Sequence, residues 1–112
     1  PSGKLLHSTV FTSAERIGDT ALDNSFVLDF SETQPMCVLR DPATGWQLEI
    51  RPDKSYPYLQ IYIPPHRNSI AIENLSAPPD AFNNGIGLIT LAAGASTSFA
   101  TQYIIKKGAI SL

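Results

Sequence analysis

A single acid interrupts an apolar strand pattern in the second half of the chain. The stretch SIAIENL places Ile70 and Ile72 where a buried strand is expected, and Glu73 follows at once. Burial disfavours the charged form of a carboxyl group, and a carboxyl moved toward neutrality is a useful proton acceptor or donor at physiological pH. Glu73 is therefore a candidate catalytic residue. The alternative interpretation is a glutamate at a strand edge that points into solvent, and the pattern alone leaves both open.

A second candidate site lies in PYLQIYIPP, where aliphatic residues alternate with Tyr58, Gln60 and Tyr62. A period of two puts the aliphatic side chains on one face of a strand and the Tyr-Gln-Tyr set on the other. Tyrosine rings stack on the C–H faces of sugars, and an amide both donates to and accepts from hydroxyl groups. The set suits a carbohydrate. Tyrosines that pack across strands on a solvent-exposed face explain the same pattern.

Other chemistries find little support in the residue types. Cys37 is the single cysteine, which excludes an internal disulfide and a cysteine-based zinc site, and its apolar run MCVL predicts a buried thiol. His7 and His66 are far apart, lack metal-ligand spacing and are expected on the surface or in loops. No serine stands in a Gly-x-Ser-x-Gly motif, so a hydrolase triad is not predicted.

The segment PPDAFNNG that follows Glu73 has the composition of a turn. Asp80 is expected to cap this turn with its side chain, and Asn84-Gly85 is a hairpin signal. The sequence Asn-Leu-Ser at Asn74 formally matches a glycosylation acceptor. A glycan there would block a site at Glu73, so we interpret the match as chance.

Length and charge limit the classes of partner. The 112 residues suit one domain, and the formal net charge of −2 gives no footprint for nucleic acid or for an anionic membrane. No run of about 18 apolar residues is present, so no transmembrane helix is predicted. The chain starts without a methionine, so an upstream targeting segment is not tested by this sequence. We expect a cytoplasmic location.

Hydrophobic periodicity predicts an all-β fold. GWQLEIRP alternates apolar with polar residues, and the turn DPATG links it to a hairpin partner in MCVLRD. A helix of one or two turns is expected only in Ser13–Leu22. Prolines and glycines punctuate short strands, which is typical of an antiparallel sandwich or barrel. The further predicted strands are SFVLDF, PYLQIYIPP, GLITLAAG and STSFATQYIIKKG, the last two joined by a Gly-Ala-Ser turn.

Three blocks in order, ALDNSFVL, YLQIY and IAIENLSAPPDAFNN, resemble the C-terminal part of aldose 1-epimerases, also called galactose mutarotases. DPATGWQLEI and LAAGASTSFATQYII are similar to further blocks of that family, and the resemblance runs from about Pro1 to Ile105. It implies a large antiparallel β-sandwich, the galactose mutarotase-like supersandwich. Residues 1–112 are then expected to form a single segment, the C-terminal part of a longer chain.

The resemblance also implies roles for particular residues. Glu73 matches the catalytic base, which takes the proton from the anomeric hydroxyl of a free hexose. Asp23 and Gln60 match residues that hydrogen-bond sugar hydroxyls, and Tyr62 is expected beside them in the substrate site. The implied reaction is the interconversion of α and β anomers by acid–base ring opening, which needs no cofactor and no metal.

This sequence departs from the family in one important respect. The family's acid is a histidine in the N-terminal part of the enzyme, and neither His7 nor His66 matches it. We therefore expect little or no mutarotase activity from these residues alone, and a carbohydrate-binding module without turnover is the alternative function. Strands that lack their neighbours would leave open edges, so a companion chain or self-association is expected as well.

Overall fold

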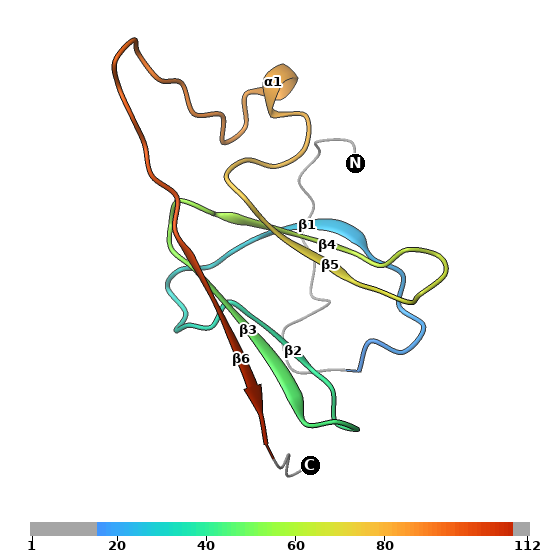
Figure 1. The fold of residues 1–112 in the computed structure, drawn as a ribbon. Helices are drawn as coiled ribbons and strands as arrows, with labels where there is room; N and C mark the ends of the chain where they lie inside the picture. The colour runs from blue at the N-terminus through green and yellow to red at the C-terminus, as the bar shows by residue number, and fades with distance from the viewer. Residues whose placement is uncertain (1–15, 109–112) are drawn as a thin grey trace.

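The structure, a computed structural model, describes residues 16–108. They form two antiparallel sheets of three strands each, with almost no helix, which confirms the predicted all-β, sandwich-like fold (Figure 1). One sheet has the strand order β1-β4-β5 and the other the order β2-β3-β6. The elements are β1 (Asp23–Val27), β2 (Cys37–Arg40), β3 (Trp46–Pro52), β4 (Tyr58–Tyr62), β5 (Ala71–Leu75), α1 (Ala81–Asn84) and β6 (Thr101–Lys107).

The β2–β3 hairpin forms where the sequence predicts it. The backbone N–H of Asp41 donates to the carbonyl of Trp46 at 2.9 Å, and the Asp41 carboxylate accepts bonds from Ala43 and Thr44 in the turn. Gly45 closes the turn with φ of 81°, and a Cβ at this position would lie 2.3 Å from the carbonyl oxygen of Gly108. Both the positive φ and the close approach therefore require glycine at this position.

The core lies between the two sheets. Ile50 of β3 and Leu59 and Ile61 of β4 are buried together with Leu22, which precedes β1. The aliphatic half of the PYLQIYIPP pattern is thus confirmed, because alternate residues of β4 face the core.

A polar bridge joins the sheets on the same inner side. The Asn74 amide of β5 donates to the Tyr103 hydroxyl of β6 at 2.7 Å. Asn74 faces inward and is half-buried, so its amide is held by the fold rather than presented to solvent.

The segment GLITLAAG is not a strand, contrary to prediction. Leu88, Ile89 and Leu91 are all exposed, and residues 86–100 project from the fold as an extended arm (Figure 1). The segment has strand propensity, but no described strand lies beside it to supply ladder hydrogen bonds. The last predicted strand does form from Thr101 onward, and it pairs with β3.

The Asn84-Gly85 pair ends a helix instead of making a hairpin. Gly85 has φ of 71°, and its N–H donates to the carbonyl of Ala81 at 2.8 Å. A helix end and a tight hairpin both need a left-handed glycine, so the dipeptide alone does not distinguish them. Asp80 does not cap the backbone with its side chain, and its carboxylate accepts a bond from the Asn83 amide.

Two smaller expectations also have outcomes. The helix expected in Ser13–Leu22 is absent from its described part, where residues 17–20 form a turn, and residues 13–15 lie outside the described range. Cys37 is half-buried, and this burial raises the pKa of its thiol, in keeping with a structural role.

No helix within residues 16–108 is long and apolar enough to cross a membrane.

A buried acid organises the outer face of the β2-β3-β6 sheet. Glu49 accepts bonds from Arg51 at 2.9 and 3.1 Å, from Lys106 at 2.8 Å and from Gln47 at 3.0 Å. The bonds donated by Lys106 and Arg51 lower the pKa of Glu49 from 4.5 to about 2. The ionised form is therefore the one that the folded chain favours.

Replacing Glu49 with Gln should make the free energy of unfolding change less with pH in the acid range. A carboxyl whose pKa is lowered on folding stabilises the fold above its unfolded pKa, and this contribution is lost as pH falls from about 4.5 to about 2. Glu49→Gln should therefore destabilise the chain more at about pH 7 than at about pH 3. Urea unfolding at both pH values measures this, with Glu32→Gln, at an exposed site without an ion pair among the described residues, as the control. Equal loss at both pH values would contradict it.

Candidate functional site

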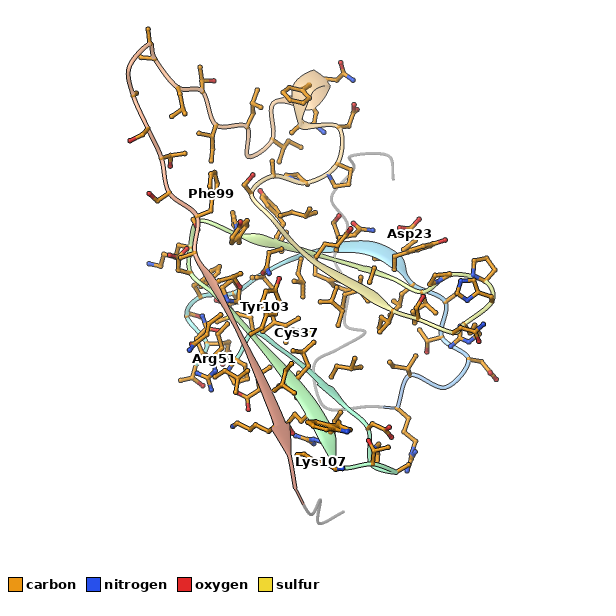
Figure 2. All side chains as sticks on the ribbon, in the orientation of Figure 1. Asp23, Cys37, Arg51, Phe99, Tyr103 and Lys107 are labelled. Atoms are coloured by element: carbon orange, nitrogen blue, oxygen red, sulfur yellow. The ribbon has the colours of Figure 1, made fainter. Side chains whose placement is uncertain are left out.

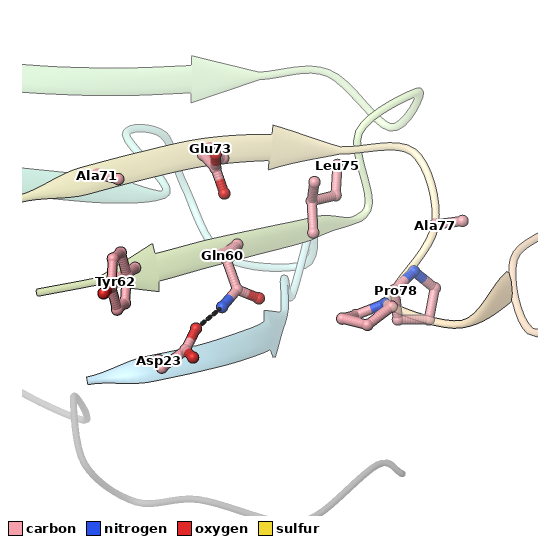
Figure 3. A pocket seen from close by; sticks show the side chains of 9 residues that line it. Asp23, Gln60, Tyr62, Ala71, Glu73, Leu75, Ala77 and Pro78 are labelled. Carbon is pink, nitrogen blue, oxygen red and sulfur yellow. Dashed lines mark hydrogen bonds between the residues drawn. The ribbon is translucent and has the colours of Figure 1, made fainter. Parts of the chain in front are cut away.

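The register of the β1-β4-β5 sheet brings the predicted site residues to one face. Gln60 in the central strand lies opposite Ser25 of β1 and Glu73 of β5, and Tyr62 lies opposite Asp23. Side chains alternate along each strand, so all five point away from the core. Figure 3 shows Asp23, Gln60, Tyr62 and Glu73 on this face.

These side chains line an open groove with a volume of about 440 Å³. The sheet forms its base, and the chain beyond β5 forms one end, where Pro78 is buried and Pro79 is half-buried (Figure 3). The Pro-Pro pair thus forms part of the groove wall at this end. The lining residues are Asp23, Gln60, Tyr62, Ala71, Glu73, Leu75, Ala77, Pro78 and Pro79.

Gln60 is the buried polar centre of the groove, with 7% of its surface exposed. Its Nε2 donates to Asp23 Oδ1 at 2.8 Å, and its Oε1 accepts a bond from the Ser25 hydroxyl. These two bonds fix which end of the amide faces which neighbour. The amide therefore presents a defined pattern of donor and acceptor to the groove, with Asp23 held beside it.

Glu73 is exposed, so the expectation of partial burial is wrong. Its neighbours Ile72 and Asn74 face the core, and Glu73 faces the other way on an outer strand of the sheet. Its carboxylate makes no hydrogen bond or ion pair within residues 16–108. Glu73 can therefore both point toward solvent and belong to a site, because the exposed face of the sheet is also the wall of the groove.

The Tyr-Gln-Tyr set contributes only two of its three members. Tyr62 lines the groove with 37% of its surface exposed. Tyr58 is half-buried and packs near Gly87, where a Cβ would come within 3.1 Å of the ring. The arm that begins after α1 thus covers Tyr58. The contact between Gly87 and Tyr58 is long-range and had no signal in the sequence.

Ser25 is a hydrogen-bond partner of Gln60 that the sequence did not single out. It sits two residues after Asp23 on the same face of β1, and it bonds the amide of Gln60. The period of two in ALDNSFVL contains this signal, since Asp23 and Ser25 must share a face if the segment is a strand.

No cation lines the groove among the described residues. His66 is exposed in the β4–β5 loop, where its Nδ1 accepts a bond from the backbone of Asn68 at 2.9 Å. Arg67 donates to the carbonyls of Gly18 and Thr20. His7 lies outside the described range, and within that range no group of His, Cys, Asp and Glu residues is arranged to hold a metal ion.

The groove is therefore acidic and rich in acceptors. Two carboxylates, at Asp23 and Glu73, flank an amide that both donates and accepts. Such a surface accepts hydrogen bonds from several hydroxyl groups at once, and it repels phosphate. Its electrostatics suit a neutral polyhydroxylated molecule better than a phosphorylated one.

Comparison with protein families gives a match over nearly the whole chain. The family model described as aldose 1-epimerase matches residues 1–104, which include every residue of the groove. Comparisons with curated proteins and with solved structures found no significant match.

A double-mutant cycle should detect the bond between Ser25 and Gln60. Ser25→Ala and Gln60→Ala each remove one partner of a partly buried hydrogen bond, so their effects on unfolding free energy should not add. We expect a coupling energy of about 0.5–1.5 kcal/mol from urea unfolding. Ser69→Ala, at an exposed site in the β4–β5 loop, should be additive with Gln60→Ala. Additivity of the Ser25 and Gln60 variants would contradict the network.

Proposed function

Because the chain belongs to the aldose 1-epimerase family, we propose that its groove binds a free hexose as a pyranose and takes part in the interconversion of the α and β anomers. The observation that carries this proposal is the meeting of Asp23, Gln60 and Glu73 on one face of a single sheet. Neighbouring strands lie about 4.8 Å apart, so three strands offer polar groups on the scale of one sugar ring.

In this proposal Asp23 and Gln60 bind and orient the sugar. The Asp23 carboxylate accepts bonds from hydroxyl groups, and the Gln60 amide is already oriented by Asp23 and Ser25. A preorganised amide loses little freedom when the ligand arrives. Tyr62 supplies a partly exposed ring at the edge of the groove that can stack on the C–H face of the sugar.

Glu73 acts as the general base. It removes the proton from the anomeric hydroxyl while an acid protonates the ring oxygen, so that the C1–O5 bond breaks and the sugar opens. Rotation about the C1–C2 bond and closure on the other face give the other anomer, with both protons returned. The Glu73 carboxylate is free of internal partners among residues 16–108 and stands next to the amide that holds the ring, which suits a base that must meet the substrate directly.

The family's histidine acid is the part that the described groove does not supply. No histidine, lysine or cysteine lines it within the described range, and the nearest candidates by sequence, His7 and His66, do not match the family's acid. We therefore propose that the acid comes from a group outside the described groove. A carbohydrate-binding module without turnover is the second candidate function, and the same observation favours it.

Added imidazole should reveal whether Glu73 acts as a general base in mutarotation. The chain alone should barely accelerate the optical-rotation change of freshly dissolved α-glucose, because no histidine lines the part of the groove that the structure describes. Imidazole supplies a diffusible acid, so chain and imidazole together should exceed the sum of their separate rates. Glu73→Gln should abolish this excess, while sugar binding, followed by NMR titration, should survive.

The controls separate the two candidate functions. Glu32→Gln, at an exposed site far along the chain, should behave like the parent. If the chain binds sugar through Asp23 but shows no excess rate with imidazole, the result supports the carbohydrate-binding module and contradicts the role of Glu73 as a base. Absence of glucose and galactose binding would overturn both, and a high rate without imidazole would show that the chain carries its own acid.

A further inference from the structure

The outer edge of β6 is a long strand edge without a neighbour among the described residues. β6 pairs with β3 along all seven residues from Thr101 to Lys107. Figure 1 shows β3 and β2 on one side of it and no described strand on the other. Unpaired N–H and C=O groups on such an edge are a template for another strand.

An apolar face continues to this edge. Ile105 is 70% exposed and Tyr103 is 53% exposed, and both lie on the inner face of the sheet, the face that carries Trp46, which is 48% exposed. A hollow of about 430 Å³ lies on this face at the far end from the core. Its lining residues are Leu39, Arg40, Asp41, Trp46, Gln47, Leu48 and Ile105.

The two lysines of β6 are held toward β3. Lys106 binds the carboxylate of Glu49 at 2.8 Å, and the Lys107 ammonium lies 5.1 Å from the centre of the Trp46 ring. Lysines commonly protect strand edges from pairing because their charge resists burial. Here both charges have partners on the neighbouring strand, and the outer edge is left open. Figure 2 shows Tyr103 and Lys107 along β6.

We propose that β6 pairs antiparallel with β6 of a second copy of this chain, around a twofold axis at Ile104. In this register Gln102 lies opposite Lys106 of the partner subunit, and Thr101 lies opposite Lys107 of the partner subunit. Tyr103 lies opposite Ile105 of the partner subunit. The two sheets join into one continuous six-stranded sheet.

The sequence of β6 is complementary to itself in this register. Both lysines face neutral polar side chains, so no like charges stand opposite each other. Tyr103 opposite Ile105 is a pair of an aromatic and a β-branched side chain, which is favourable across antiparallel strands. The twofold axis repeats this pair, so it occurs twice in the dimer. It covers the two most exposed apolar side chains of β6. A twofold contact is closed, so it ends at a dimer.

Opposite charges introduced at Gln102 test the register. Gln102 is exposed, so its replacement should leave the fold intact. Gln102→Glu places a carboxylate opposite Lys106 of the partner subunit, twice per dimer, and should tighten the dimer roughly two- to tenfold. Gln102→Lys places like charges there and should weaken the dimer by a similar factor. Sedimentation equilibrium of the 112-residue chain over a range of concentrations measures both.

The expected result is a monomer–dimer equilibrium with opposite shifts for the two variants, which salt should diminish. Ile105→Lys should also weaken the dimer, whereas Val27→Lys, at a similarly exposed valine on the other sheet, should not. Circular dichroism confirms that each variant folds. A parent that stays monomeric would overturn the proposal. So would open-ended aggregation, or the same shift from both Gln102 variants.

Discussion

The buried position of Leu59 and Ile61 in β4 is the constraint on which the site depends. These two residues fix which face of the central strand meets the core, and with a period of two they force Gln60 and Tyr62 onto the other face. A slip of one residue would turn the amide into the apolar core and turn the aliphatic pair toward the groove. The hydrophobic effect therefore sets the position of the polar groups, although none of them takes part in it.

Pairing with β4 determines which side chains of β1 and β5 lie on the groove face. Antiparallel pairing puts Ser25 and Glu73 directly beside Gln60, one from each side. β1 and β5 meet only through β4, and they come from segments almost fifty residues apart. The groove is thus a product of register, and the bonds from Gln60 to Asp23 and Ser25 lock the row once the strands have paired.

The sequence predicted correctly those features that depend on residues close together along the chain. The β2–β3 hairpin, β4, and the common face of Asp23, Gln60, Tyr62 and Glu73 followed from alternation, turn chemistry and family resemblance. Glu73 is exposed because β5 is an outer strand, and strand order is a tertiary property that alternation does not report. The same limit applies to GLITLAAG. Its composition suits a strand, yet strand structure needs a partner whose presence the segment does not encode.

The inner side of β5 links the two sheets to the orientation of the acid. Asn74 points inward and binds Tyr103 of β6, so its neighbour Glu73 must point outward into the groove. Tyr103 lies on the inner face of β6, so this bond joins the outer strand of one sheet to the outer strand of the other. The direction in which Glu73 points therefore depends on the contact between the sheets as well as on the register within its own sheet.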